Sequence, residues 1–453
     1  MITTVNPATE EILANYEELT SEQIEEKLRQ SIEAFESWKK TSLAERSSLM
    51  KKLAKLIRER KNDYGKLITS EMGKVFKQSL GELDKCAFTA ELYAEDLENM
   101  LAPQNVKTEG SESYVTFEPI GPVLAIMPWN FPFWQALRFA IPNILAGNVG
   151  VLKHSSMVQG CARELEDLFL DAGFPEGVFQ NLCISSSQVE GLIRDSRIKA
   201  VTLTGSNAVG SKVASIAGEC LKKTVMELGG SDPYIVLADA DIDLAAKIGV
   251  QARLRNAGQT CTSAKRFIVV KEIAEEFTNK FLDYWNLIKV GDPMDTSIDM
   301  GPLASAKILG EVKKQVSDSE LKGARIVAGG KSIDGKGFYF EPTVLVGVTK
   351  GMPAYDEEVF GPVAAIIVAE DTDHAIEIAN DSIYGLGSSL WTRSLETAKS
   401  LVPRIEAGSV YVNNMLASDP RLPFGGVKQS GYGRELSALG IKEFMNIKAI
   451  WIK

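Results

Sequence analysis

Apolar residues in the first hundred positions recur at the three- and four-residue spacing of amphipathic helices. From Ala8 to Tyr64 the chain has no Gly or Pro, and residues 20–23 (Thr-Ser-Glu-Gln) have the sequence of a helix capping box. A second such sequence occupies residues 42–45 (Ser-Leu-Ala-Glu). Apolar stripes follow the two boxes, formed by Ile24, Leu28, Ile32, Phe35, Leu49, Leu53, Leu56 and Ile57. The pattern therefore predicts helical structure from Ala8, continuing to about Leu101.

Short apolar runs then alternate with helix-compatible segments. Ser113–Phe117 is predicted to be a strand, and a longer alternating series lies between Gly121 and Leu237. Its predicted strands are Val123–Met127, Val149–Leu152, Ala200–Leu203 and Tyr234–Leu237, and its predicted helices include Gln135–Leu145 and Cys161–Asp171. Such alternation is typical of an α/β fold with a doubly wound parallel sheet, which binds nucleotides beyond the carboxyl ends of its strands.

The same alternation continues from Gly230 to about Gly431. Ile242–Arg255 is predicted to be a helix that ends near Gly258, and Phe267–Val270 is predicted to be a strand. Charged helical segments are predicted at residues 272–285, 305–316 and 373–378. They separate further strands, such as residues 363–368. Neither an internal repeat nor a long linker interrupts the chain. We therefore expect two closely packed α/β parts with the active site between them.

The amino-acid composition is that of a soluble globular protein. The 453 residues are 45% hydrophobic and 24% charged, which indicates two or three domains. A formal net charge of −10 argues against nucleic acid and anionic membranes as partners. The N-terminal residues resemble neither a signal peptide nor a membrane span, so we expect a cytoplasmic protein.

Five cysteines and two histidines restrict the available chemistry. The cysteines are odd in number and irregularly spaced, which does not indicate a disulfide framework. His154 and His374 are too few for a His-rich site, and we expect no metal. Cys261 lies between a predicted helix and a predicted strand, where backbone N–H groups would lower its pKa and hold an oxyanion. It is either such a nucleophile, with a carboxylate as the base for hydrolysis, or a small buried residue.

Five short motifs follow one another in a fixed order around this cysteine. They are residues 128–132 (Pro-Trp-Asn-Phe-Pro), 226–230 (Met-Glu-Leu-Gly-Gly), 256–266 (Asn-Ala-Gly-Gln-Thr-Cys-Thr-Ser-Ala-Lys-Arg), 357–362 (Glu-Glu-Val-Phe-Gly-Pro) and 423–431 (Pro-Phe-Gly-Gly-Val-Lys-Gln-Ser-Gly). In this order and spacing they resemble the aldehyde dehydrogenase superfamily. The resemblance runs from Asn6 to the C-terminus.

The resemblance implies three structural parts. A doubly wound, parallel-sheet cofactor domain would comprise residues 1–107 and 123–229, and an α/β catalytic domain would comprise residues 230–437. Residues 108–122 and 438–453 would form a small β oligomerisation arm. In the family the strand that corresponds to Ser113–Phe117 pairs with the C-terminal strand of a neighbouring subunit, and residues 446–453 match that C-terminal strand. The resemblance therefore implies a homodimer or a dimer of dimers.

The resemblance also implies a role for each catalytic residue. Cys261 would attack an aldehyde carbonyl as a thiolate. The Asn130 side-chain amide and the backbone N–H of Cys261 would hold the resulting oxyanion. Glu227 would act as general base for the water that hydrolyses the thioester, unless it only pairs with a neighbouring lysine such as Lys222 or Lys223.

Seven residues match cofactor-binding positions of the family. Gly205 and Ser206 would place a helix N-terminus against the pyrophosphate. Lys153 would reach the adenosine ribose and Glu358 the nicotinamide ribose, with Trp129 and Phe360 lining the nicotinamide region. The position three beyond Lys153 carries Ser156 and not a glutamate that repels a 2′-phosphate. We therefore expect NADP to be preferred, with NAD as the other cofactor.

Two arginines near the motifs indicate the substrate. Arg138 lies eight residues after Asn130 and Arg255 six before Cys261, with Arg253 as a rival on the same helix. Paired guanidinium groups suit a substrate with a distal carboxylate. These positions match succinate semialdehyde dehydrogenases, so the resemblance predicts oxidation of succinate semialdehyde to succinate. Oxidation of a broader range of aldehydes, or of another semialdehyde, is the alternative.

Overall fold

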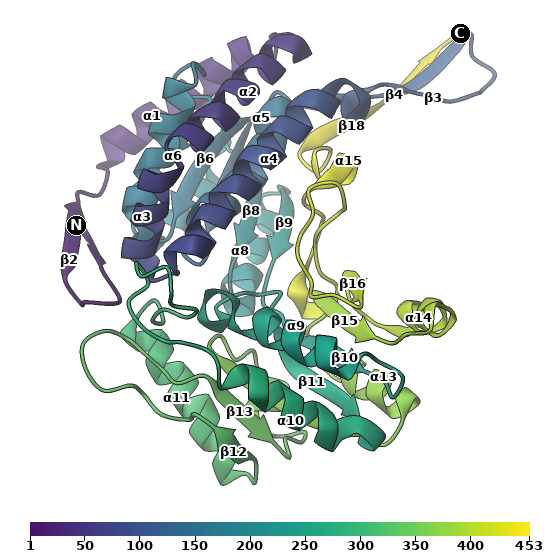
Figure 1. The fold of residues 1–453 in the computed structure, drawn as a ribbon. Coiled ribbons are helices and arrows are strands. Elements are labelled where there is room, and N and C mark those ends of the chain that lie inside the picture. Colours follow the sequence, from purple (N-terminus) through teal and green to yellow (C-terminus); the bar gives the residue numbers. More distant parts are fainter.

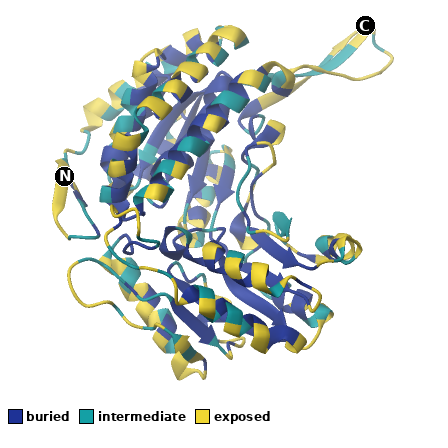
Figure 2. Ribbon diagram, viewed as in Figure 1, coloured by how far each residue is buried: buried dark blue, intermediate teal, exposed yellow.

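Two large sheets, a three-stranded arm and a small N-terminal hairpin contain the strands of the computed structural model, which describes residues 1–453 (Figure 1). The two large sheets occupy separate lobes, and the arm projects away from both. Figure 2 shows that the central strands of both lobes are buried, whereas the arm is mostly exposed or half-buried. None of the helices is both long and apolar enough to cross a membrane.

The first sheet is doubly wound, as predicted. Its strand order is β17 (Gly431–Tyr432), β9 (Lys223–Glu227), β8 (Ala200–Thr204), β5 (Pro122–Met127), β6 (Val149–His154) and β7 (Phe179–Asn181), parallel except for β17. Alternate residues of β5 enter two different cores, because successive side chains point to opposite faces. One core includes α5 (Pro132–Leu145) and α6 (Gln159–Asp171), and the other includes α7 (Val189–Arg194) and α8 (Asn207–Glu219).

The second sheet has seven strands in the order β12 (Arg325–Ala328), β13 (Thr343–Val346), β14 (Val363–Ala369), β11 (Ala264–Val270), β10 (Asp232–Val236), β15 (Gly387–Trp391) and β16 (Ser409–Val412). Only β12 is antiparallel to its neighbour. The apolar run Tyr234–Leu237, predicted within the first alternating series, therefore belongs to this second sheet. The helices of this half are α9 (Ile242–Leu254), α10 (Ala274–Trp285), α11 (Ala306–Leu321), α12 (Pro353–Asp356), α13 (Thr372–Asn380) and α14 (Leu395–Leu401).

The N-terminal segment departs from the helical prediction. Ile12–Tyr16 forms strand β2, which pairs antiparallel with β1 (Ile2–Val5). A backbone turn at Glu10, with φ 62°, brings the two strands together. The predicted helices begin only at the capping box, where Thr20 and Gln23 bond reciprocally. They are α1 (Ser21–Trp38), α2 (Leu43–Glu59), α3 (Lys61–Met72) and α4 (Phe76–Leu101).

The arm corrects a second prediction. Strand β18 (Met445–Ile452) pairs along its whole length with β4 (Glu112–Pro119) of the same chain, and β3 (Gln104–Asn105) flanks β4 on the other side. The C-terminal strand therefore completes its own arm, and pairing of β4 with the C-terminal strand of a neighbouring subunit is not what the structure shows. The limits of the three parts stay a prediction, since β3 and β17 each join a sheet outside their predicted part.

A buried ion pair joins α4 to the start of α5. Lys74 Nζ and Glu82 Oε2 are in contact, with the two side chains 0% and 1% exposed. Glu82 Oε1 accepts hydrogen bonds from the backbone N–H groups of Phe133 and Trp134, both at 2.9 Å. A carboxylate at this position satisfies free N–H groups of the first helical turn and is favoured by the helix dipole. The pair thereby fixes the segment that begins directly after Asn130.

Glu82→Gln should test this anchor. Glutamine keeps an acceptor for the two N–H groups but leaves the Lys74 ammonium buried without a counter-charge. We expect the folded state to lose about 3–5 kcal/mol, seen as a lower apparent Tm in thermal scans. The double variant Lys74→Met/Glu82→Gln should recover much of this loss. An unchanged Tm in the single variant would contradict the assignment.

Candidate active site

The loop that carries Cys261 is held in an unusual backbone conformation. Between α9 and β11, Asn256, Ala257 and Gly258 have φ values of 54°, 52° and 74° in succession. A Cβ on Gly258 would lie 2.1 Å from the Gly361 carbonyl oxygen, so only glycine fits there. Left-handed conformations in non-glycine residues cost free energy and persist where the surroundings enforce them. The contacts around Asn256 supply that enforcement.

Asn130 and Asn256 join this loop to the first lobe. The Asn256 Nδ2 group donates to the Asn130 carbonyl oxygen at 2.9 Å, and Asn130 Nδ2 donates to the Gln259 carbonyl oxygen at 3.0 Å. Asn130 is buried and its Oδ1 has no hydrogen-bond partner. Its amide therefore lies against the backbone two residues from Cys261, with one N–H not engaged by protein.

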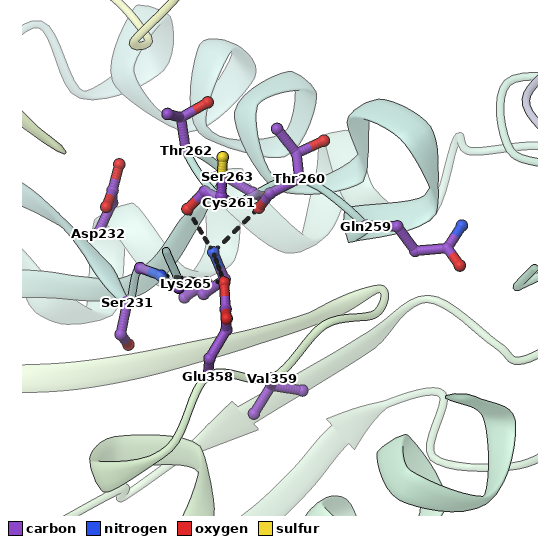
Figure 3. Close-up of polar contacts among 12 residues, drawn as sticks. Ser231, Asp232, Gln259, Thr260, Cys261, Thr262, Ser263, Lys265, Glu358 and Val359 are labelled. Atoms are coloured by element: carbon purple, nitrogen blue, oxygen red, sulfur yellow. Dashed lines mark hydrogen bonds and ion pairs between the residues drawn. The ribbon is translucent and has the colours of Figure 1, made fainter. Parts of the chain in front are cut away.

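Lys265 supports the loop from below (Figure 3). Its Nζ donates to the carbonyl oxygens of Thr260 and Cys261 at 3.0 and 2.8 Å, and lies 3.2 Å from Glu358 Oε1. The side chain is buried on β11. A buried ammonium needs such partners, and here it fixes the carbonyl groups of the two peptide units that flank the Cys261 Cα.

The surroundings of Cys261 favour the neutral thiol over the thiolate in this structure. Burial raises its pKa to about 11, while the charges of Arg138 and Lys265 act in the opposite direction. The expectation that backbone N–H groups lower this pKa is therefore wrong, because the loss of solvent around the thiol outweighs the nearby positive charge.

Glu227 ends strand β9 as a buried, unpaired acid. Neither carboxylate oxygen has a hydrogen-bond partner. Burial raises its pKa well above the ordinary value, and the nearby Glu435 carboxylate adds to the shift. The alternative pairing with lysine is not formed: Lys222 bonds to backbone carbonyls, and Lys223 pairs with Glu443. A carboxyl group whose pKa is raised in this way is a stronger base than an exposed carboxylate, which suits it to take a proton from water.

Glu435 links Glu227 to Arg138. Glu435 Oε2 lies 2.5 Å from Arg138 Nε in a pair that is almost fully buried, although the N–H is not directed at the oxygen. Burial raises the pKa of Glu435, and Arg138 opposes this shift. Arg138 Nη2 also bonds Thr204 Oγ1 at 3.2 Å. Arg138 is therefore already paired with a carboxylate of the protein, independently of any substrate.

A cavity of about 270 Å³ connects the thiol to the predicted arginines. Its lining includes Cys261, Arg138 and Arg255, together with Lys85, Trp134, Phe424 and Ser418. Arg253 is not in the lining, because its guanidinium group is buried against the carbonyl oxygens of Val359, Gly361 and Val363. Of the two rivals, Arg255 is the one that lies beside the thiol.

The predicted phosphate-side residues gather at one edge of the first sheet. Lys153 is the penultimate residue of β6, Ser156 is exposed at the start of the following turn, and Ser206 precedes α8 after β8. Strand order reverses at β5, which lies between β6 and β8, so these residues surround a topological switch point. Ser206 occupies the N-cap position, but its side chain makes no capping hydrogen bond.

The predicted nicotinamide-side residues lie next to the Cys261 loop. Trp129 and Phe360 meet edge to face with ring centroids 5.9 Å apart. Glu358, which is paired with Lys265, is closely approached by Gly229, where a Cβ would lie 2.6 Å from Glu358 Oε2. Glycine at 229 is therefore what allows this carboxylate to stand beside strand β9.

Comparison with known proteins gives the family. Residues 1–450 match the model of the aldehyde dehydrogenase family. The chain belongs to this family. It is 45% identical over 451 residues to a probable NADP(+) succinate-semialdehyde dehydrogenase of Synechocystis sp., covering 100% of this chain and 99% of the relative. It is 46% identical over 455 residues to the NADP(+) succinate-semialdehyde dehydrogenase of Mycobacterium avium, covering 100% and 96%.

A solved structure extends the likeness to the fold. The crystal structure of succinic semialdehyde dehydrogenase from Streptococcus pyogenes in complex with NADP+ superimposes with a TM-score of 0.98 and 40% identity, with 100% of each chain covered. This agreement confirms the α/β fold class of the present aldehyde dehydrogenase. Its five cysteines are all free, and no group of three His, Cys, Asp or Glu side chains is placed to hold a metal ion.

Sequence reasoning missed four residues of this aldehyde dehydrogenase site. They are Lys85, Lys265, Ser418 and Glu435. Lys265 lies within a motif and precedes an apolar run typical of a strand that is buried on both faces. The sequence therefore indicates that its ammonium is buried and needs polar partners. Lys85, Ser418 and Glu435 lie outside the five motifs, and only the fold brings them to the cavity and to Arg138.

Proposed function

We propose that this aldehyde dehydrogenase oxidises succinate semialdehyde to succinate with NADP+. One observation carries the proposal: the cavity that holds the Cys261 thiol also holds the guanidinium groups of Arg138 and Arg255. A guanidinium group can donate two parallel hydrogen bonds to a carboxylate, so these arginines would bind the carboxylate at the far end of a four-carbon semialdehyde. The named activities of the cyanobacterial, mycobacterial and streptococcal relatives support the same substrate and cofactor.

Broader aldehyde oxidation is the second candidate. The cavity also has aromatic walls, formed by Trp134 and Phe424, against which an uncharged alkyl chain would pack. Arg138 is already paired with Glu435 and so offers less charge to a substrate than its position suggests. Aldehydes without a carboxylate are therefore expected to bind, with lower kcat/KM.

Cys261 begins the reaction as the nucleophile. Its thiolate adds to the aldehyde carbon, and the Asn130 N–H that has no protein acceptor, with the Cys261 backbone N–H, holds the oxyanion. Each such donor contributes roughly 3–4 kcal/mol to the transition state. Arg138 and Lys265 favour the thiolate electrostatically, against the effect of burial. The adduct becomes an acyl thioester on Cys261 when its C–H bond breaks and the hydrogen leaves as hydride, for which a bound nicotinamide would be the acceptor.

Glu227 completes the reaction as general base. It takes a proton from the water that attacks the thioester, and the Cys261 thiol leaves. The raised pKa of Glu227 supports this role, because it makes the carboxylate a stronger base toward water. Glu435 and Arg138 also affect this proton transfer, because Glu435 raises the pKa of Glu227 and Arg138 lowers it.

The residues at the sheet edge fit a phosphorylated dinucleotide. Lys153 has no ion-pair partner, the Ser206 side chain is not used as a cap, and Ser156 is exposed beside Lys153. These groups would hold the adenosine and phosphate part, and Glu358 the ribose next to Cys261. A bound nicotinamide supplies the hydride acceptor. The small, neutral Ser156 leaves room for a 2′-phosphate, so NADP is preferred over NAD.

The arm supports assembly into a homodimer or a dimer of dimers. Strand β18 is the edge of its sheet, and its Ile447 and Trp451 side chains are 59% and 56% exposed. Apolar side chains on a free strand edge favour association with another surface. A second copy of the chain is the partner we propose.

Glu227→Gln should stop turnover after one event. Hydride transfer does not need the base, whereas thioester hydrolysis does, so we expect one equivalent of reduced cofactor per subunit and then a steady rate lowered about 100-fold or more. Rapid-mixing absorbance of the reduced nicotinamide measures both phases. Cys261→Ala is the control and should give no burst. Turnover at the parental rate would exclude this role for Glu227.

Ser156→Glu should shift cofactor preference toward NAD. The new carboxylate repels a 2′-phosphate and accepts hydrogen bonds from an unmodified ribose, which should change the ratio of kcat/KM for NADP to that for NAD at least about tenfold. Ser156→Gln is the matched control, because it adds the same bulk without the charge. If both variants change the ratio equally, size and not charge decides the preference.

Arg255→Met should weaken recognition of the distal carboxylate. Losing a charge-assisted hydrogen bond of about 1.5–3 kcal/mol lowers kcat/KM for succinate semialdehyde roughly 10- to 150-fold and leaves butanal nearly unaffected. Arg138→Met should lower the rates for both aldehydes, because Glu435 is then left unpaired near Glu227. Equal losses for both aldehydes in the Arg255 variant would give that arginine a structural role.

A further inference from the structure

Lys85 places a third cation in the cavity of Cys261. It extends from α4, and its Nζ donates to Ser418 Oγ at 2.6 Å and lies 4.1 Å from the centre of the Trp134 ring. No carboxylate lies within 4 Å of this ammonium, so it has no ion-pair partner. A buried amine usually has one, and its absence here leaves a charge that faces the cavity.

The acids near Lys85 are already engaged elsewhere. Glu82, in the same cavity wall, pairs with Lys74. Asp419, next to Ser418, pairs with Arg421 at 2.6 Å. On the helix itself, Asp84 pairs with Lys61, and the other adjacent titratable group is the buried Cys86 thiol.

The two arginines of the cavity differ in whether a protein carboxylate pairs with them. Arg138 is paired with Glu435, whereas the Arg255 side chain makes a single hydrogen bond, at 3.4 Å to Thr262 Oγ1. The cavity therefore holds two cationic side chains, Lys85 and Arg255, that no protein acid neutralises. They extend from different elements, α4 and the turn before Cys261, toward one space.

The protonation of Lys85 is finely balanced. Burial lowers its pKa to about 7, and the charges of Arg255 and Arg138 add to this effect. Cys86 and Asp419 act in the opposite direction but are smaller influences. An anion placed in the cavity would restore part of the lost charge stabilisation, which favours the ammonium form.

We propose that Lys85 binds the distal carboxylate of the substrate together with Arg255, and that it takes up a proton from solvent as the carboxylate arrives. This inference rests on the proposed oxidation of a carboxylated aldehyde. The neutral amine gains one proton and becomes an ammonium ion, and no bond to the substrate forms or breaks.

The proposal fixes the direction of a pH effect. Below about pH 7 the free enzyme already carries the Lys85 ammonium, and the preference for succinate semialdehyde over butanal is constant. Above that pH the proton must be recruited, so the preference falls by up to tenfold per pH unit until the pKa of the complex is reached. Titration of the thiol does not contribute, because both aldehydes require it and the ratio cancels it.

The test compares kcat/KM for the two aldehydes between pH 6 and 9, at saturating NADP+. Lys85→Met should lower the ratio at pH 6.5 about tenfold or more and remove its dependence on pH. Lys85→Arg keeps a permanent cation, so its ratio should stay near the low-pH value up to pH 9. Lys77→Met is the matched control, since Lys77 is an exposed lysine of the same helix paired with Asp299. It should behave like the parent.

Two outcomes overturn the inference, and they are distinguishable. If the parent prefers succinate semialdehyde but Lys85→Met and Lys85→Arg both keep its ratio and pH profile, Lys85 has no part in recognition, and the proposed function stands. If the parent shows no preference at any pH, the carboxylated substrate itself is wrong. A Lys85→Met protein that does not fold leaves the arginine variant to decide between these results.

Discussion

The position of Lys265 is the constraint on which the active site depends. One buried ammonium binds the carbonyl groups of Thr260 and Cys261 and also faces Glu358, the acid proposed to hold the cofactor ribose. The nucleophile loop and the cofactor acid are therefore attached to the same strand of the second sheet. The contacts of Asn256 enforce the left-handed backbone at one end of the loop, and Lys265 fixes the loop at its other end.

Arg138 has a similar central position in the electrostatics. Burial raises the pKa of Cys261, Glu227 and Glu435, and in each case Arg138 acts in the opposite direction. Burial in the site without ligands therefore shifts all three groups toward their neutral forms, and a single guanidinium group limits all three shifts. Charge brought in or removed near Arg138 would change the nucleophile and the base together, which is consistent with their use in successive steps.

The sequence predicted the parts of this structure that depend on local pattern or on motifs. The capping box at Thr20, the alternation around β5 and the placement of Arg255 beside Cys261 all agree with the structure. The predictions that failed depend on contacts between distant segments. Strand β2 exists only because β1 pairs with it, and the pKa of Cys261 is set by packing from other elements. Lys85 looks like a surface lysine until α4 is placed against the cavity.

The pairing of β4 with β18 has a consequence for how the chain is made. Ser111 Oγ donates to the Ile452 carbonyl oxygen across 341 residues, so during translation the arm can close only after the residues between β4 and β18 have been made. Until then β4 presents an unpaired edge, and nascent chains associate wrongly through unpaired edges of this kind. Completion of the arm is therefore a late event, and it removes an exposed edge only once both lobes have been synthesised.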